Sequence, residues 1–125
     1  MVKKPILVVD DEPIVRESIR DWLKDAGYKI ETAETGEEAL EMIKKQDFSI
    51  IVLDIRLPGQ TGITVLKQVK ALKPEIKSII ITAYPSDDLL NEAKRLGAID
   101  YLIKPIAPDD LERLIRETLL KCDED

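Results

Sequence analysis

Residues 49–59 read Ser-Ile-Ile-Val-Leu-Asp-Ile-Arg-Leu-Pro-Gly, and they are the most informative segment about the fold. Residues 50–53 are four consecutive apolar side chains, three of them β-branched, which is typical of a strand buried on both faces of a sheet. Asp54 follows this strand directly, and Pro58-Gly59 then predicts a turn. A carboxylate in this position needs a positive partner or a function, because burying an unpaired charge is costly.

Strand-like and helix-like segments alternate along the whole chain. Five segments have the composition of strands: residues 5–9, 28–33, 50–53, 78–81 and 100–103. Each is followed by apolar residues at helical spacing, with helix starts predicted at Pro13, Thr35, Thr61, Ser86 and Pro108. Such units imply a parallel sheet covered by helices on both faces, because each crossover returns the chain to the same end of the sheet. We therefore predict an α/β fold of flavodoxin-like (βα)5 topology, with strand order 2-1-3-4-5 and one domain over residues 1–125.

Composition excludes several classes of function. The chain has 125 residues, a formal net charge of −6 and no histidine. No cluster of Lys and Arg stands out, so we expect no direct binding to nucleic acid or to a membrane surface. The lack of histidine excludes His-based catalytic triads, most zinc sites and a phosphohistidine-carrier role. The single cysteine, Cys122, cannot form an internal disulfide, and we expect a cytoplasmic location.

Polar side chains follow four of the five predicted strands, in chain order Asp10 with Asp11, Asp54, Thr82 and Lys104. The carboxyl ends of parallel strands meet at one edge of the sheet, so we expect these groups to share one pocket. Carboxylates at close range repel each other by roughly 4 kcal/mol per pair at about 4 Å and an effective dielectric near 20. Lys104 supplies one compensating charge. A divalent cation is the natural second one, and a site of oxygen ligands alone favours Mg²⁺ or Mn²⁺.

This combination of groups suits phosphoryl transfer. A carboxylate beside a divalent cation, a hydroxyl and an ammonium group can position and neutralise a phosphoryl group. One carboxylate is then the nucleophile that forms an aspartyl phosphate. Asp54 stands alone at the central strand, whereas Asp10 and Asp11 are adjacent and suited to holding a metal. We therefore assign the phosphoryl group to Asp54.

Four motifs of the chain resemble those of the response-regulator receiver domain, the CheY-like domain of two-component signal transduction: residues 7–12, 53–59, 81–84 and 100–105. No single motif would suffice, but the four in order are specific and cover essentially the whole chain. The resemblance implies that Asp54 accepts a phosphoryl group from a sensor histidine kinase or a phosphotransfer protein, and that a partner-binding surface then changes. Such a domain catalyses its own phosphorylation and dephosphorylation but turns over no separate substrate.

The resemblance also implies roles for individual residues around the metal. Asp11, Asp54 and the backbone carbonyl of Arg56 would ligate Mg²⁺, and Asp10 would help through water. Lys104 would bind one phosphoryl oxygen.

Further residues would respond to the phosphoryl group. The Thr82 hydroxyl and the Ala83 backbone amide would bind a second phosphoryl oxygen, and Tyr101 would swing inward when Thr82 moves. The Lys104–Pro105 peptide bond would be cis, as it usually is in this family. Two variable positions that tune the rates of phosphorylation and hydrolysis are occupied by Arg56 and Tyr84.

Two other classes with related folds fit the chain less well. A haloacid-dehalogenase-type phosphatase needs a second acid two residues after its nucleophile, where this chain has Arg56. A flavodoxin-like nucleotide binder needs a Gly/Ser/Thr-rich phosphate loop after the first strand, where residues 10–12 are all acidic.

Several questions stay open within the family. The chain fits a stand-alone regulator, a receiver module cut from a larger transcriptional regulator, and a binding module that signals without phosphorylation. A homodimer through the fourth helix, fifth strand and fifth helix is also open, and the output partner is unknown. Four residues have purely structural roles as alternatives. Asp10 and Asp11 would then be an acidic pair at a helix start, and Thr82 and Tyr101 would occupy ordinary strand positions.

Overall fold

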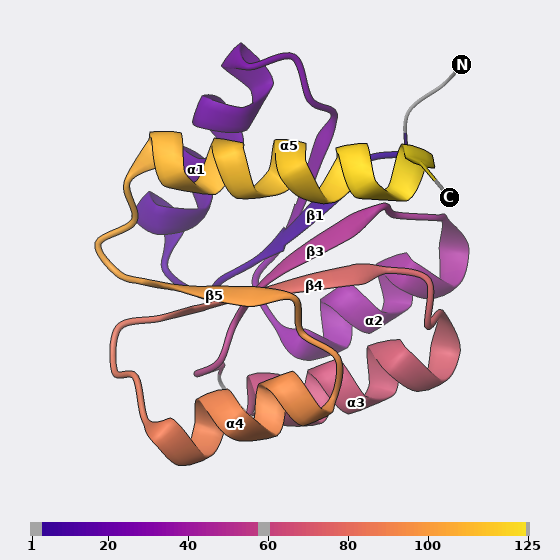
Figure 1. Ribbon diagram of the computed structural model, residues 1–125, viewed down its shortest axis with the longest axis vertical. Coiled ribbons are helices and arrows are strands. Elements are labelled where there is room, and N and C mark those ends of the chain that lie inside the picture. The colour runs from indigo at the N-terminus through magenta and orange to yellow at the C-terminus, as the bar shows by residue number, and fades with distance from the viewer. Residues whose placement is uncertain (1–3, 58–60, 125) are drawn as a thin grey trace.

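Five parallel strands form one sheet in the order β2-β1-β3-β4-β5 (Figure 1). The computed structural model describes residues 4–57 and 61–124, so the predicted Pro58-Gly59 turn lies outside the described residues. The strands are β1 (Ile6–Val9), β2 (Ile30–Ala33), β3 (Ile50–Asp54), β4 (Lys77–Thr82) and β5 (Asp100–Ile103). The predicted flavodoxin-like fold and strand order are confirmed.

A helix follows each strand: α1 (Pro13–Asp25), α2 (Gly36–Lys45), α3 (Gly62–Leu72), α4 (Asp87–Arg95) and α5 (Pro108–Glu124). Local sequence starts three of them as predicted, because the side chains of Thr35, Thr61 and Ser86 each accept a hydrogen bond from the backbone N–H three residues on. None of the helices, as far as the described residues extend, combines the length and the apolar character needed to cross a membrane.

The second strand begins two residues later than the sequence predicts. Tyr28 lies just after the end of α1, where its N–H donates to the carbonyl of Leu23 and the N–H of Gly27 donates to that of Lys24. Gly27 has a φ of 98°, the left-handed conformation that closes a helix in this way. The backbone of Tyr28 is therefore engaged by the helix end, and strand pairing starts at Ile30.

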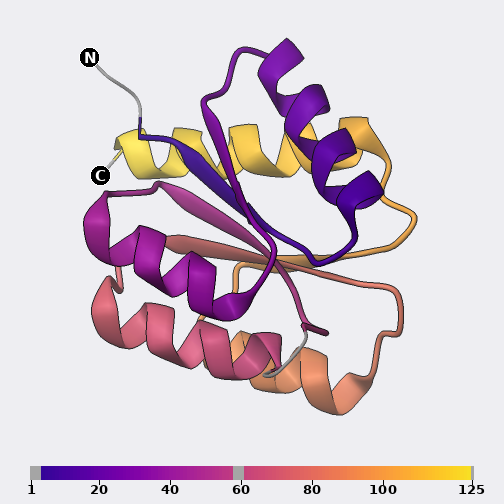
Figure 2. The same cartoon turned by 180° about the vertical axis from the view of Figure 1, so that it is seen from behind.

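Two apolar layers hold the helices against the sheet. α1 and α5 cover one face, and α2, α3 and α4 cover the other (Figures 1 and 2). Alternate residues of β3 point to opposite faces, with Ile51 and Leu53 packing toward α2 and α3 and with Ile50 and Val52 packing toward α1 and α5. All four are fully buried. Packing on both sides therefore holds the carboxyl end of β3, where Asp54 stands, in place.

Candidate functional site

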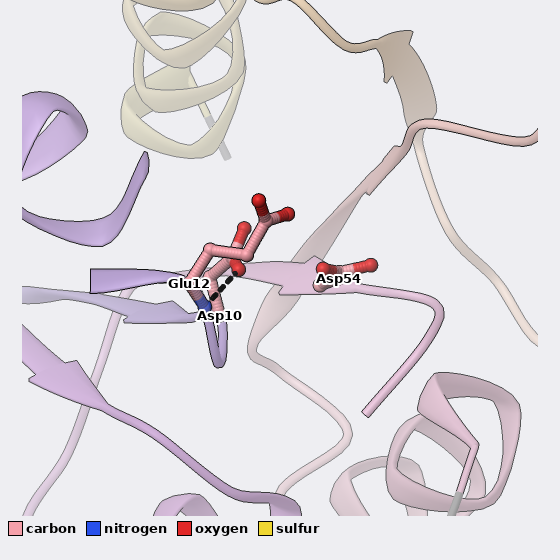
Figure 3. Close-up of side chains that lie close together, drawn as sticks. All are labelled: Asp10, Glu12 and Asp54. Carbon is pink, nitrogen blue, oxygen red and sulfur yellow. Dashed lines mark hydrogen bonds between the residues drawn. The ribbon is translucent and has the colours of Figure 1, made fainter. Parts of the chain in front are cut away.

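Two carboxylates lie side by side where neighbouring strands end. Val9 of β1 pairs with Leu53 of β3, so the next residues, Asp10 and Asp54, share the carboxyl edge of the sheet. Both are buried. Glu12 joins them from the start of α1 (Figure 3), and one carboxylate oxygen from each of the three lies within 4.8 Å of the others.

Lys104 brings the compensating charge from the end of β5. Its Nζ lies 2.9 Å from Asp10 Oδ2, 2.8 Å from Glu12 Oε1 and 2.9 Å from Asp54 Oδ2. The contacts to Glu12 and Asp54 are hydrogen bonds. The contact to Asp10 is a close ion pair without hydrogen-bond geometry, which leaves the buried Asp10 Oδ2 without a hydrogen-bond partner among the described residues. The predicted convergence of Asp10, Asp54 and Lys104 is thus present.

Burial and charge act against each other at this site. Burial raises the pKa of Asp10, and the hydrogen bond from the Glu12 N–H and the Lys104 ammonium oppose that rise without cancelling it. Burial by itself lowers the pKa of Lys104, but the contacts with the carboxylates of Glu12, Asp10 and Asp54 outweigh it, and the pKa of Lys104 is raised. The ammonium therefore stays protonated throughout the neutral range.

The backbone orients each buried carboxylate in the same way. Asp10 Oδ1 accepts a hydrogen bond of 2.9 Å from the N–H of Glu12, and Asp54 Oδ1 accepts one of 2.9 Å from the N–H of Arg56. One oxygen of each carboxylate is thereby held by the chain two residues on. The other oxygen, Oδ2, faces Lys104.

Gly62, the first residue of α3, lets this helix start close to the backbone of Asp54. Its N–H donates a hydrogen bond of 2.7 Å to the carbonyl of Ile55. A Cβ at this position would lie 2.5 Å from the backbone oxygen of Asp54 and 2.6 Å from the Cα of Ile55. Both are backbone atoms, which cannot move aside cheaply, so the close approach requires glycine. The sequence interpretation did not single out Gly62.

The remaining residues of the predicted site lie around this cluster. Thr82 is buried, and its Oγ1 accepts a hydrogen bond of 3.1 Å from the N–H of Tyr84. Ala83 next to it is exposed. Tyr101 is half-buried and packs against the apolar layer that α4 helps to form. The Lys104–Pro105 bond is cis, as the resemblance implies.

The two predicted rate-tuning residues touch each other. The guanidinium carbon of Arg56 lies 4.6 Å from the centroid of the Tyr84 ring, which is a cation–π geometry. Both side chains are exposed. They join the loop after β3 to the loop after β4 beside the buried carboxylates.

Glu12 is the site residue that sequence reasoning missed, and the acidic cluster contains it rather than Asp11, which is exposed. A signal was present in the chain. Glu12 is the N-cap residue of α1, a position that favours Ser, Thr, Asp or Asn, and its side chain makes no capping hydrogen bond. A glutamate at an N-cap between an acidic pair and Pro13 indicates a side chain used for something other than the helix.

The donor set fits a divalent cation. Three carboxylates share one ammonium, and within residues 4–57 and 61–124 a buried carboxylate oxygen of Asp10 has no hydrogen-bond partner. Carboxylate oxygens are the ligands that Mg²⁺ prefers. The pocket is therefore compatible with Mg²⁺ and with phosphorylation of an aspartate.

Comparisons with known proteins agree with this geometry. The family described as response regulator receiver domain matches residues 6–116. The transcriptional regulatory protein ZraR of Escherichia coli is 40% identical over 118 residues, and the chain spans 26% of its length. Sporulation initiation phosphotransferase F of Bacillus subtilis is 33% identical over 119 residues, and the match covers 95% of this chain and 96% of that protein.

A solved structure gives the same result. The CheY-like response regulator receiver domain protein of Methanospirillum hungatei is 33% identical, with a TM-score of 0.95 over 98% of each chain. Domains of this family are signalling modules that interact with histidine kinases or phosphotransfer proteins and bind Mg²⁺ through acidic residues. With its fold, its acidic pocket and its sequence all in agreement, this chain belongs to the receiver domains of two-component response regulators.

Proposed function

We propose that residues 1–125 form a single receiver domain that accepts a phosphoryl group on Asp54. The donor is the phosphohistidine of a sensor histidine kinase or of a phosphotransfer protein. The observation that carries this proposal is the placement of the Lys104 ammonium 2.9 Å from Asp54 Oδ2, at the strand edge where the acidic cluster gathers. Such an arrangement offers a nucleophilic carboxylate beside a fixed positive charge.

The phosphoryl group is transferred twice, first from the phosphohistidine to Asp54 and then from Asp54 to water. An oxygen of the ionised Asp54 carboxylate attacks phosphorus, an O–P bond forms, and the P–N bond of the phosphohistidine breaks with its electron pair going to the imidazole. In hydrolysis water attacks the same phosphorus, the O–P bond to Asp54 breaks, and inorganic phosphate leaves. The domain assists both steps on itself and turns over no separate substrate, so it is not an enzyme in the usual sense.

The residues of the pocket bind and orient the phosphoryl oxygens. Lys104 remains protonated at neutral pH and donates to one of them, and the Thr82 hydroxyl with the Ala83 backbone amide donates to another. Charge on a transferring phosphoryl group is spread over its oxygens, so catalysis depends mainly on such positioning. The contact between Arg56 and Tyr84 lies beside the acceptor and supports their role in tuning the two rates.

Mg²⁺ is the cofactor of this proposal, with Mn²⁺ as a substitute. Its ligands would be the carboxylates of Asp11 and Asp54 and the backbone carbonyl of Arg56, with Asp10 acting through water. When bound, the ion neutralises charge on the phosphoryl oxygens. Titrating Mg²⁺ into the Asp11→Asn variant tests the ligand role of Asp11. We expect this substitution to lower the affinity for Mg²⁺. Unchanged affinity would exclude Asp11 as a ligand.

The signal then moves from Thr82 to the α4 side of the sheet. We expect the Thr82 hydroxyl to leave the N–H of Tyr84 for the phosphoryl group, and Tyr101 to move into the space that Thr82 vacates. Tyr101 packs against the same buried layer as Leu89 and Leu96 of the α4 region, so its movement would alter the surface of α4, β5 and α5. A new contact of this kind biases an element that has two arrangements. This face is the proposed site for an output partner or a homodimer.

Two relatives suggest different outputs. ZraR is a transcriptional regulatory protein of which the chain matches 26%, whereas phosphotransferase F is matched over 96% of its length. We propose that this domain works in the cytoplasm and signals through a protein partner or an output domain, and that it does not itself contact nucleic acid or a membrane.

Mass spectrometry tests the acceptor directly. Incubation with acetyl phosphate and Mg²⁺ is expected to add one phosphoryl group to the wild-type domain and none to Asp54→Asn, and EDTA is expected to prevent the addition. Asp21→Asn, an exposed position on α1, serves as the matched control and is expected to be phosphorylated like the wild type. No adduct on the wild type would overturn the proposal. An adduct on Asp54→Asn would move the acceptor to another residue.

A further inference from the structure

Three carboxylates compete for one ammonium at this site. An ammonium group has three N–H donors, and carboxylate oxygens of Asp10, Glu12 and Asp54 lie 2.8–2.9 Å from Lys104 Nζ. Two of these donors make hydrogen bonds to Glu12 and Asp54, and the ammonium also forms a close ion pair with Asp10. A phosphoryl oxygen that binds Lys104 therefore competes with these carboxylates for the ammonium.

Glu12 is the partner that can be released with least cost. Its side chain is 58% exposed, whereas those of Asp10 and Asp54 are 0% and 5% exposed. A buried carboxylate that loses its cation is left uncompensated, but an exposed one is solvated by water. The two aspartates are also held by backbone N–H groups, while the Glu12 side chain has no role in capping α1.

Glu12 also adds negative charge close to the acceptor. One of its carboxylate oxygens and one of Asp54 belong to a group of atoms that lie within 4.8 Å of each other. An incoming phosphoryl group is an anion, so the charge of Glu12 opposes its entry at the same time as the side chain occupies Lys104. Both effects act in the same direction.

We infer that Glu12 is a positioning residue that holds the Lys104 ammonium while Asp54 is unmodified and releases it when a phosphoryl group binds. This inference rests on the proposed function of Asp54. Glu12 acts through Lys104 and sets the balance between the unmodified and the phosphorylated domain. Its contact with Lys104 joins residues 92 positions apart.

Two substitutions distinguish the effect of the Glu12 charge from the effect of its contact with Lys104. Glu12→Gln keeps the shape and removes the charge, whereas Glu12→Asp keeps the charge but is one methylene shorter and cannot reach Lys104 from the same backbone position. Glu17→Gln removes the same charge from an exposed position on α1 and is the matched control. The probe is beryllium trifluoride, an anionic phosphoryl mimic, titrated calorimetrically at saturating Mg²⁺.

We expect Glu12→Gln to tighten binding of the mimic by about 3- to 10-fold, since one nearby repulsive charge and one competing contact are removed. Glu12→Asp should tighten it by a smaller factor, because only the contact is lost. Glu17→Gln should bind like the wild type. Equal affinity in the wild type and both Glu12 variants would overturn the inference.

A spectroscopic readout tests the contact without any ligand. In protein carrying ¹⁵N-labelled lysine, the Nζ resonance of Lys104 is assigned by its loss in Lys104→Met. Both Glu12 variants are expected to shift that resonance and to speed exchange of its protons with water, and Glu17→Gln is expected to leave it in place. An unchanged Lys104 resonance in the Glu12 variants would overturn the inference.

Other outcomes separate this inference from the proposed function. If the wild-type domain binds no mimic in the presence of Mg²⁺, both the proposed function and the inference about Glu12 are wrong. Binding by the wild type, with weaker mimic and Mg²⁺ binding in both Glu12 variants, would leave the proposed function intact. It would show instead that Glu12 is a metal ligand, which contradicts its role as a releasable partner of Lys104.

Discussion

The Nζ of Lys104 lies 2.9 Å from Oδ2 of Asp54, although 50 residues separate them in the chain. The strands that carry them are not neighbours, because β4 lies between β3 and β5. The long lysine side chain crosses the end of β4 and also reaches Asp10, which follows β1. One ammonium therefore ties together the carboxyl ends of three strand regions.

Removing this ammonium should destabilise the domain in a pH-dependent way. Lys104→Met leaves the buried carboxylates of Asp10 and Asp54 without a cation, and we expect the free energy of unfolding at pH 7 to fall by about 3 kcal/mol. The wild-type ammonium is charged at both pH 7 and pH 5, since its pKa is raised. Burial raises the pKa of Asp10. In the variant, protonation of Asp10 should therefore recover part of the loss at pH 5.

Urea denaturation at the two pH values measures this effect. Lys94→Met, at an exposed position on α4, is the control and should change stability little at either pH. An equal loss at pH 7 and pH 5 in Lys104→Met would mean that lost packing, and not uncompensated charge, causes the destabilisation.

The pair formed by Arg56 and Tyr84 should act as a unit. Their cation–π contact is exposed, and such contacts contribute about 0.5–1 kcal/mol. We expect Arg56→Met and Tyr84→Leu each to change the lifetime of the aspartyl phosphate, and the double variant to change it by less than the product of the two factors. The lifetime is measured after removal of the phosphodonor. Strictly multiplicative effects would show that the two side chains act independently.

Gly62→Ala should disturb the acceptor site as well as the fold. The added Cβ would meet the backbone oxygen of Asp54 at 2.5 Å, so the start of α3 must move away from Asp54, at a cost of about 1–3 kcal/mol. We expect weaker binding of beryllium trifluoride with Mg²⁺. Gly27→Ala is the control, because its φ of 98° also strains the backbone but lies at the end of α1 away from the site. It should lower stability and leave binding unchanged, and equal binding in both variants would contradict the role given to Gly62.

Alkaline pH should weaken the contact between Tyr28 and Glu112. The Tyr28 hydroxyl donates a hydrogen bond of 2.8 Å to Glu112 Oε2, and burial together with that carboxylate raises the pKa of Tyr28 to about 12. Because the folded-state value is above the unfolded one of about 10, the stabilisation is complete below pH 10 and is lost as pH rises from 10 toward 12.

Tyr28→Phe should remove this dependence. The hydroxyl is only partly buried, so solvent screening reduces the effect to about 1 kcal/mol. Urea midpoints at pH 8 and pH 11 measure it, with Tyr84→Phe at an exposed position as the control. The prediction is contradicted if the wild-type domain loses no more stability between pH 8 and pH 11 than the Tyr28→Phe variant does.

Much of the site was predictable because it follows from strand ends. Residues 50–53 have the composition of a doubly buried strand, and they are fully buried in β3. Once all strands are parallel, their carboxyl ends meet at one edge, and Asp10, Asp54 and Lys104 must converge. The caps at Thr35, Thr61 and Ser86 were predictable for a similar reason, since each depends on residues within one turn of the helix.

Glu12 and Gly62 were not predictable in this way. The direction of the Glu12 side chain depends on Lys104, which lies 92 residues later. The need for glycine at position 62 depends on how closely the start of α3 approaches the backbone of Asp54. Neither relationship has a local pattern, because both arise only when distant segments are packed together.

The order of the elements, the strand that carries Asp54 and the edge at which the acidic and basic groups gather all follow from the amino-acid sequence. Hydrophobic periodicity, caps and turn residues act over a few positions and can be read along the chain. The tertiary structure was needed to identify the carboxylates that share the Lys104 ammonium. Their contacts depend on how far side chains reach between strands that are far apart in the sequence. The tertiary structure placed Glu12 in the cluster and left Asp11 exposed.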